Sequence, residues 1–281
     1  MENTVSIWKI KGKALLVDQP LIMGIVNVTP DSFYNGGRYQ EKDKAVEKAL
    51  TLVQQGADII DVGGESTRPG SQPVSETEEL NRVIPAIEGI SRQTNVPISC
   101  DTYKSKVAEL ALQAGASIIN DISGFRFDQR NIEVVGKHQC GCILMHMLGT
   151  PQTMQQSPCY QNVVEEIKDF LRERLEILRK AGVSLERIVL DPGIGFGKRL
   201  EDNLTILRHA GEFGLFDRPV LIGASRKSFI GTILDASPEK RLEGSIAAAV
   251  MALSAGAMIF RVHDVAETKA ALKVAWKILH P

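Results

Sequence analysis

The chain has 281 residues, of which 43% are hydrophobic and 24% are charged, and its formal net charge at pH 7 is −1. This near-neutral balance excludes a basic surface for nucleic acid and argues against an anionic membrane as a partner. The length allows one large domain or two small ones.

The beginning of the chain, Met1–Thr4, has no basic segment followed by an apolar one, so we expect no secretory signal. The four cysteines form no Cys-x-x-Cys pair, and three of them fall in apolar runs typical of buried strands. They are Cys100, Cys140, Cys142 and Cys159. We therefore expect packed, reduced thiols of a cytoplasmic protein, in preference to zinc ligands or disulfides.

The first predicted element is a β-hairpin over Ile7–Val17, because Lys11-Gly12-Lys13 separates two short alternating stretches. Eight apolar runs follow, and each has polar or glycine residues at its C-terminal end. They are Leu21–Asn27, Asp58–Val62, Val96–Asp101, Ser117–Asp121, Cys140–His146, Ile188–Leu190, Pro219–Ala224 and Ala257–His263. The predicted helices between them include Lys42–Gln55, Glu76–Arg92, Lys104–Ala114, Asn131–Lys137, Asn162–Lys180, Glu201–His209 and, at the end, Val265–Leu279.

The stretch Ser245–Phe260 is apolar but too short to span a membrane. We expect a buried helix here, which ends at Gly256 before the last strand.

Strands that alternate with helices and carry polar groups at their ends are typical of an eight-stranded parallel barrel. We therefore predict a single-domain α/β protein, a (β/α)8 TIM barrel over residues 20–281, with an N-terminal hairpin extension over residues 1–19. Such a barrel needs roughly 250 residues, and its active site lies where the C-terminal ends of the strands meet.

Asp101, Asn120 and Asp191 end the third, fourth and sixth runs or directly follow them, so they should face one another across this mouth. The carboxylate of Asp191 can accept two parallel hydrogen bonds, which suits a planar ligand with adjacent N–H groups, such as a 2-aminopyrimidinone edge. Asn120 can donate and accept, and Lys227 can donate to a ring oxygen or nitrogen. The alternative is a divalent metal held by Asp101 and Asp191, although the spacing does not select one.

Arg261 and His263 lie two residues apart on the last strand, so their side chains project to the same side. Asn27 ends the first strand, which neighbours the last one when the barrel closes. This cluster suits a multiply charged anion. The alternative is an Arg–carboxylate pair at the barrel rim together with a solvated histidine.

The segment Ser225–Ser228 precedes a helix, whose free amides would attract a carboxylate or phosphate near Lys227. The alternative is simple capping of that helix by Ser225 or Ser228. Two long loops, Val28–Gln40 and Gly63–Ser75, are typical of lids at a catalytic face.

In order along nearly the whole chain, seven segments resemble the dihydropteroate synthase family. They are Asn27–Phe33, Gly63–Gly70, Asn120–Ile122, Met145–Met147, Asp191–Lys198, Ser225–Ser228 and Arg261–Asp264. The resemblance implies a homodimeric TIM barrel of folate biosynthesis that joins 6-hydroxymethyl-7,8-dihydropterin diphosphate to 4-aminobenzoate, releases diphosphate and uses Mg²⁺. The implied partners are these small molecules and a second copy of the chain, without nucleic acid or membrane.

The resemblance also implies roles at individual positions. Asp101, Asn120, Asp191 and Lys227 would hold the pterin, with Met145 and Phe196 lining its slot. Asn27, Arg261 and His263 would bind the diphosphate, and Asn27 would also bind magnesium. Thr67, Arg68, Pro69, Phe33 and Ser228 would form the aminobenzoate site. The residues with catalytic roles would be Asp101, Arg261, His263 and Lys227.

The family commonly has an acidic residue at the position of Asn35, where it could help to hold magnesium. We therefore expect a weaker metal contact from this loop, for which Asp31 could partly substitute.

The implied reaction is displacement at a methylene attached to an electron-rich ring, so diphosphate can depart before the amine attacks. The arylamine is already a free base at neutral pH, and no strong general base is needed. One alternative is a pterin-binding methyltransferase module, which would need neither both long loops nor the anion cluster. Another is a non-catalytic binding protein that resembles the synthase.

Overall fold

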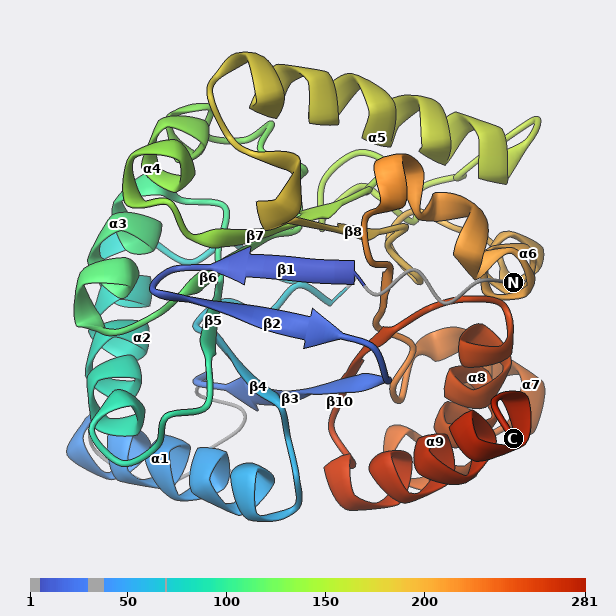
Figure 1. The fold of residues 1–281 in the computed structure, drawn as a ribbon, viewed down its shortest axis with the longest axis horizontal. Coiled ribbons are helices and arrows are strands. Elements are labelled where there is room, and N and C mark those ends of the chain that lie inside the picture. Colours follow the sequence, from blue (N-terminus) through green and yellow to red (C-terminus); the bar gives the residue numbers. More distant parts are fainter. Residues whose placement is uncertain (1–5, 30–37, 69) are drawn as a thin grey trace.

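The chain folds into a ring of parallel strands surrounded by helices (Figure 1). The computed structural model describes residues 6–29, 38–68 and 70–281. Within these residues the barrel strands are β3 (Leu21–Asn27), β4 (Ile59–Gly63), β5 (Ile98–Asp101), β6 (Ile118–Asp121), β7 (Gly141–Met145), β8 (Ile188–Asp191), β9 (Leu221–Ile222) and β10 (Ile259–Val262).

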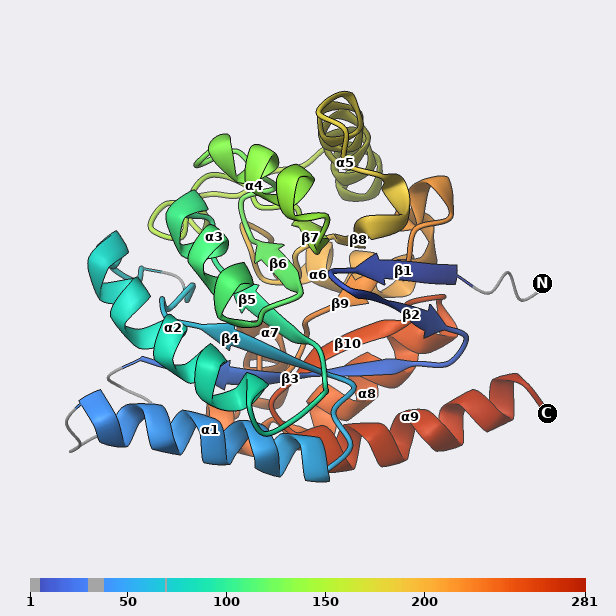
Figure 2. The same ribbon diagram turned by 60° about the vertical axis from the view of Figure 1, so that its left-hand side comes forward.

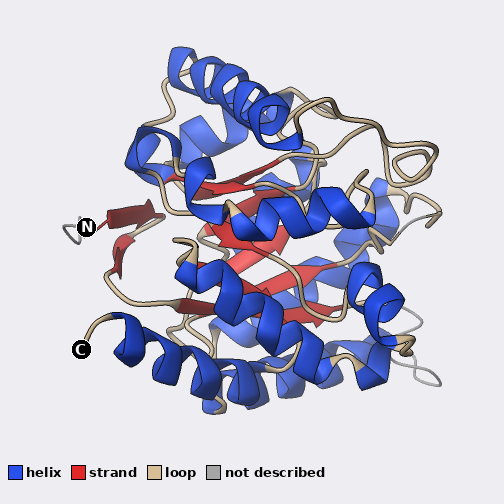
Figure 3. Ribbon diagram, turned by 90° about the vertical axis from the view of Figure 1, so that its right-hand side faces the viewer, coloured by secondary structure: helices blue, strands red, loops and turns tan. Residues whose placement is uncertain are grey.

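The α-helices lie outside the strands on all sides (Figure 3). In the described residues they are α1 (Arg38–Gln54), α2 (Glu76–Ser91), α3 (Ser105–Ala114), α4 (Arg130–His138), α5 (Val163–Lys180), α6 (Leu200–Arg208), α7 (Ser228–Leu234), α8 (Leu242–Ser254) and α9 (Val265–Leu279). None of these helices has the length and apolar composition needed to cross a lipid bilayer.

The strands form one parallel sheet in the order β8-β7-β6-β5-β4-β3-β10-β9. A parallel bridge between Leu190 and Val220 joins its two ends, and the N–H of Leu190 donates to the carbonyl of Pro219 over 3.0 Å. The sheet is therefore closed into a barrel, and the predicted fold class is confirmed.

The predicted strands all exist, and the largest difference is at β9, where Pro219–Ala224 was expected and only Leu221–Ile222 pairs regularly. Pro219 has no N–H to donate, so regular pairing begins after it. Asp58, the first residue of the predicted strand Asp58–Val62, lies just before β4, where its carboxylate accepts the N–H of Ile22 over 2.8 Å.

Both faces of the barrel strands are buried, as β3 illustrates. Ile22 and Val26 pack in the layer between strands and helices, whereas Leu21 and Met23 point into the barrel. This alternation places one apolar layer outside the sheet and a second layer inside it. The buried, unpaired state of Cys100, Cys140 and Cys142 agrees with the sequence, and Cys159 is free and exposed.

The predicted hairpin is present and consists of β1 (Ser6–Ile10) and β2 (Lys13–Val17), which pair antiparallel. Figures 1 and 2 show it lying across one end of the barrel. Trp8, Ile10 and Val17 pack there against inward-pointing residues from the N-terminal parts of the strands, and the indole N–H of Trp8 donates to the carbonyl of Arg187 over 2.9 Å. The hairpin therefore covers the N-terminal end, and a ligand must enter from the other end.

Replacement of Trp8 by Ala should lower the free energy of unfolding by about 3–5 kcal/mol, because a fully buried indole leaves a cavity at the bottom of the core. Urea denaturation measures the effect. Leu16→Ala is the matched control on the same hairpin, since this side chain is 52% exposed, and should change stability by less than about 0.5 kcal/mol. Equal losses in the two variants would show that the hairpin is not part of the core.

Candidate active site

The C-terminal ends of the strands bring together the polar residues that the sequence singled out. In the strand register Asn27 lies opposite Gly63, Gly63 opposite Asp101, and Asp101 opposite Asn120. Met145 lies opposite Asp191 in the same way. The predicted pterin residues Asp101, Asn120, Met145 and Asp191 therefore lie at the same C-terminal end of the barrel, which we call its opening.

Arg261 is the centre of this opening, because it bridges two carboxylates from different strands. Its Nε donates to Asp61 Oδ2 over 2.6 Å and its Nη2 donates to Asp101 Oδ2 over 2.8 Å. The alternative of an Arg–carboxylate pair is thus present, although it lies inside the barrel mouth. Two hydrogen-bond donors of the guanidinium are used in these contacts, and three remain for a ligand.

Asp61 is a member of this site that the sequence analysis missed. It lies within β4 and is fully buried, and Asn120 Nδ2 is 3.5 Å from its Oδ2. The signal in the sequence is a single carboxylate within the apolar run Ile59–Val62. Asp61 Oδ1 and Asn120 Oδ1 have no hydrogen-bond partner in the described residues. Buried acceptors of this kind indicate that a ligand supplies the missing donors.

The charges in the opening shift one another's pKa values. Burial raises the pKa of Asp101 to about 7, against the lowering effect of Arg261 and with a further rise from Asp61. Burial lowers the pKa of Lys227 to about 7, and Asp191 opposes this effect. Burial would also lower the pKa of Arg261, but Asp61 and Asp101 together raise it. The opening therefore contains one acid and one base that both titrate near neutral pH.

One wall of the opening is formed by the glycine-rich loop after β8. Gly193 has φ +71°, and a Cβ there would overlap the carbonyl oxygen of His146, so only glycine fits. Its N–H donates to Asp191 Oδ1 over 2.7 Å, while burial raises the pKa of that carboxyl. The loop carries Phe196, whose ring centroid lies 4.2 Å from Lys227 Nζ.

Phe196 also packs on an apolar cluster of Ile122, Met145, Met147 and Met154, together with Tyr103. The opening thus has an apolar wall beside its carboxylates and its lysine. A flat ring with polar edges matches this combination of surfaces.

The sequence analysis left open whether His263 is a solvated histidine, and the structure shows that it is not. Its Nδ1 lies 3.0 Å from Ser225 Oγ, and its backbone N–H donates to the same oxygen over 3.2 Å. Burial, followed by the charges of Arg261 and Arg226, lowers the pKa of His263 to about 4. The imidazole is therefore neutral near pH 7, and a hydroxyl proton donated to Nδ1 leaves Nε2–H as a donor.

The structure does not support helix capping by Ser225 or Ser228. Helix α7 has Lys227 at its N-cap position and no side-chain capping bond there. Ser228 is its exposed first residue, and Ser225 is bound to His263. Arg226 instead binds Asp264 through two hydrogen bonds of 2.9 and 2.5 Å, which tie the loops after β9 and β10 together.

The predicted aminobenzoate residues are only partly described. Thr67 is half-buried and Arg68 is exposed in the loop after β4, and the charge of Arg68 contributes to the lowered pKa of His263. Phe33 and Pro69 lie outside the described residues, as do Asp31 and Asn35.

The described residues contain no group of three or more His, Cys, Asp or Glu side chains that could hold a metal ion. Asp101 is bound by Arg261, and Asp191 accepts the N–H of Gly193. The alternative of a divalent metal held by these two carboxylates is therefore not supported by their geometry.

Replacement of Arg261 by Met should lower the free energy of unfolding by about 3–5 kcal/mol, because it leaves two buried carboxylates without a cation. Adding Asp61→Asn should restore part of the loss, which a double-mutant cycle by denaturation measures. Arg130→Met is the control, since the Arg130 side chain is 74% exposed in its pair with Asp128 and should contribute less than about 1 kcal/mol. A cycle without coupling would mean that the three charges do not act as a unit.

Comparison with known proteins agrees with this geometry. The family described as pterin binding enzyme matches residues 23–263. A dihydropteroate synthase of Synechocystis is 47% identical over 90% of this chain and 88% of its own length. A crystal structure of Yersinia pestis dihydropteroate synthase with a sulfonamide drug complex superposes with a TM-score of 0.93 at 41% identity, over 98% of this chain and 100% of that chain.

A further solved structure is Burkholderia cenocepacia dihydropteroate synthase complexed with 7,8-dihydropteroate. It has a TM-score of 0.88 at 44% identity and covers 98% of this chain and 96% of that chain. These similarities confirm the resemblance found in the sequence. The chain belongs to the dihydropteroate synthase family of pterin-binding enzymes.

Proposed function

We propose that the chain joins (7,8-dihydropterin-6-yl)methyl diphosphate to 4-aminobenzoate, and that diphosphate leaves before the arylamine attacks. The observation that carries this assignment is the pair of unpartnered acceptors, Asp61 Oδ1 and Asn120 Oδ1, beside Arg261 at the bottom of the opening. An aminopyrimidinone ring presents N–H donors along one edge, which is what these buried acceptors lack.

In this proposal the pterin lies between the carboxylates and the Phe196 wall. Asp191 has one oxygen that already accepts the N–H of Gly193, so its other oxygen is available for the ring. Asn120 donates and accepts, and Lys227 in its ammonium form donates to a ring oxygen or nitrogen. Met145 and Phe196 exclude water from the ring faces.

The diphosphate would bind beside β10. Arg261 retains donors beyond those used by Asp61 and Asp101, and neutral His263 offers Nε2–H. As the C–O bond breaks, its electron pair leaves with the diphosphate, where these donors stabilise the growing negative charge. Ser225 keeps the imidazole oriented during this step through its contact with Nδ1.

The positive charge that develops on the pterin methylene would be stabilised by Asp101 in its carboxylate form. The lone pair of the neutral arylamine then forms the C–N bond, and the amine releases a proton to water. No group has to remove a proton before attack, because the arylamine already has a free lone pair at neutral pH.

Magnesium fits this site only as a companion of the diphosphate. The described residues offer no carboxylate cage, and Asn27 at the end of β3 would supply one amide oxygen, with the remaining ligands from diphosphate and water. When bound, the ion would supply positive charge that weakens the bond to the leaving group.

A second copy of the chain is the partner proposed for the outer face of α7, α8 and α9. Large apolar side chains are exposed on these helices, namely Ile233 (54%), Met251 (59%), Val274 (62%) and Ile278 (73%). Burial of such a surface against its own copy would remove apolar area from water. The four free cysteines support a reducing compartment such as the cytoplasm.

The test of the function is product formation by the purified protein, with dihydropteroate and diphosphate appearing in equal amounts from the two substrates. Absence of product would favour a binding protein, and transfer of a methyl group would favour the methyltransferase alternative.

Asp191→Asn should weaken binding of a pterin analogue by roughly 10- to 100-fold, because an amide reverses one hydrogen bond in a buried site. Calorimetry measures this, with Asp169→Asn on α5 as control, since that side chain is 71% exposed.

The proposal also predicts a narrow bell-shaped pH dependence of kcat/KM for the pterin diphosphate. The pKa of Asp101 is raised to about 7, so its carboxylate is lost as the pH falls through this value. The pKa of Lys227 is lowered to about 7, so its ammonium is lost as the pH rises through the same value. The maximum should therefore lie near neutral pH.

Lys227→Arg should remove the alkaline limb of that profile, because a guanidinium stays charged, while any limb that arises from the substrate remains. A profile that is flat over roughly pH 6 to 8 in the unmodified protein would contradict both assignments.

A further inference from the structure

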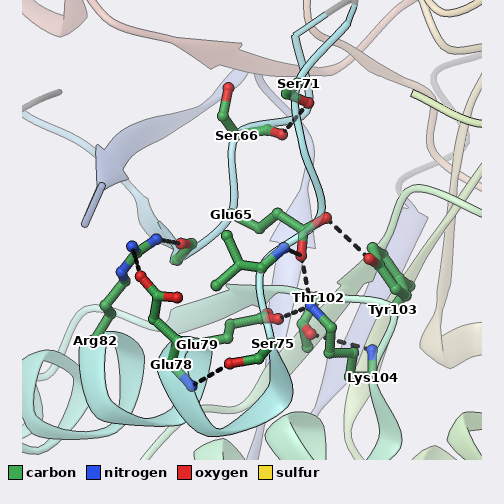
Figure 4. Close-up of polar contacts among 12 residues, drawn as sticks. Glu65, Ser66, Ser71, Ser75, Glu78, Glu79, Arg82, Thr102, Tyr103 and Lys104 are labelled. Carbon is green, nitrogen blue, oxygen red and sulfur yellow. Dashed lines mark hydrogen bonds and ion pairs between the residues drawn. The ribbon is translucent and has the colours of Figure 1, made fainter. Parts of the chain in front are cut away.

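Four residues beside the opening form a buried polar cluster that the proposed reaction does not use. This cluster, which we call the neck cluster, consists of Glu65, Glu79, Tyr103 and Lys104 (Figure 4). Lys104 Nζ donates to Glu65 Oε2 over 2.5 Å and also to Glu79 Oε2, and the Tyr103 hydroxyl donates to Glu65 Oε1 over 2.9 Å. The side chains of Glu79, Glu65 and Lys104 are 1%, 8% and 14% exposed.

Glu65 closes the loop that carries Thr67 and Arg68. It lies just after β4, and its Oε2 also accepts the N–H of Val74, just before α2, over 3.2 Å. One carboxylate therefore joins the two ends of the loop. The first end is held a second time, because Arg82 of α2 donates to the carbonyl of Gly64 over 2.8 Å.

Within the closed loop, two further hydrogen bonds limit the positions of Thr67 and Arg68. Ser71 Oγ donates to the carbonyl of Ser66 over 2.5 Å, and the N–H of Ser71 donates to the carbonyl of Arg68 over 3.0 Å. The N–H of Gly70 also donates to the carbonyl of Pro151 over 3.1 Å, which holds the middle of the loop to the segment after β7, while its two ends hold it to β4 and α2. These ends meet at the neck cluster.

The neck cluster is also connected to the pterin side of the opening. Tyr103 and Lys104 follow Asp101 and Thr102 directly, and the N–H of Thr102 donates to the carbonyl of Asn120 over 3.0 Å. Tyr103 packs, as Phe196 does, on the apolar cluster that contains Met145. The same short segment therefore contacts the pterin wall on one side and the aminobenzoate loop on the other.

The neck cluster depends on the positive charge of Lys104, which lies between two buried glutamates. Burial alone would lower the pKa of Lys104, but its hydrogen bonds to Glu65 and Glu79 raise it to about 12. Burial raises the pKa of Glu79 in spite of Lys104. Without the ammonium, two buried carboxylates would face each other, and the carboxylate on the loop would be the one free to move away.

We propose that Glu65, held by Lys104 and Tyr103, is a positioning residue for 4-aminobenzoate, which fixes Thr67 and Arg68 relative to the bound pterin. The inference rests on the proposed function. The cluster touches neither substrate and acts through the loop. A loop that is held in place before binding loses less conformational entropy when the second substrate arrives.

The experiment compares steady-state kinetics of Tyr103→Phe, Glu65→Gln and Lys104→Met. Each should raise the KM for 4-aminobenzoate, by about threefold for the single hydrogen bond of Tyr103 and by roughly 10- to 30-fold for the two charged residues. The KM for the pterin diphosphate should stay within about twofold, since Asp101, Asn120 and Asp191 are unchanged. Lys104→Arg keeps the charge and should restore most of the affinity.

Lys137→Met is the matched control, because Lys137 also pairs with a glutamate, Glu109, but lies on α4 with a 71% exposed side chain. It should alter neither KM. A purely structural role of the cluster would lower the active fraction, and hence kcat, with both KM values unchanged. That result, or an equal rise of both KM values, would overturn the inference.

Tyr103→Phe keeps the ring in its apolar contacts, so it remains informative if the charged variants fail to fold. Calorimetry with a pterin analogue confirms in each variant that the pterin site is intact. Failure of the unmodified protein to form dihydropteroate would refute the proposed function. Product formation with an unchanged aminobenzoate KM in Tyr103→Phe and Glu65→Gln would refute the positioning role alone.

Discussion

The site depends first on the ion pairs that Arg261 makes with Asp61 and Asp101 inside the barrel mouth. These residues come from β10, β4 and β5, which are not all adjacent in the sheet. Burying either carboxylate at this depth without a nearby cation would cost free energy, and the guanidinium of Arg261 compensates both negative charges. The same contacts fix its planar fork, so its remaining donors point in defined directions before any ligand binds.

The N-terminal end of the barrel contributes stability, whereas the C-terminal end carries the candidate active site. At the N-terminal end, the hairpin buries Trp8 and Ile10 among inward-pointing aliphatic side chains, and the indole satisfies its one donor on Arg187. At the C-terminal end the interior includes charged and amide side chains, and the acceptors Asp61 Oδ1 and Asn120 Oδ1 have no partner in the described residues. Tight apolar packing at one end allows polar groups to be kept at the other end at a cost that the fold can tolerate.

The sequence predicted the barrel well, because apolar runs alternate with amphipathic stretches and β-strands place their ends at one face. It also predicted that Asp101, Asn120 and Asp191 lie at strand ends on one face of the barrel, where Asp101 pairs with Asn120 and Asp191 ends β8 opposite Met145. Asp61 was missed because it lies within a strand, where its neighbours suggest only burial. The contact of Ser225 with His263 spans 38 positions and depends on side-chain rotamers, which no local pattern encodes.

In the proposed function, charge balance explains how one opening could hold both an electron-rich ring and a diphosphate. Near neutral pH Asp101 and Lys227 each exchange a proton easily, and neutral His263 donates without carrying charge. A diphosphate bound at Arg261, as proposed, would favour the charged form of Lys227, because Arg261 influences the pKa of Lys227 and an opposite charge nearby raises the pKa of an amine. In the proposed reaction, departure of the diphosphate from the methylene leaves positive charge on the pterin, which favours the carboxylate form of Asp101 in the same way. Burial holds the pKa values of Asp101 and Lys227 near neutral pH, and the proposed reaction stabilises the charged form of each group. The empty site therefore need not carry the full cost of two buried charges.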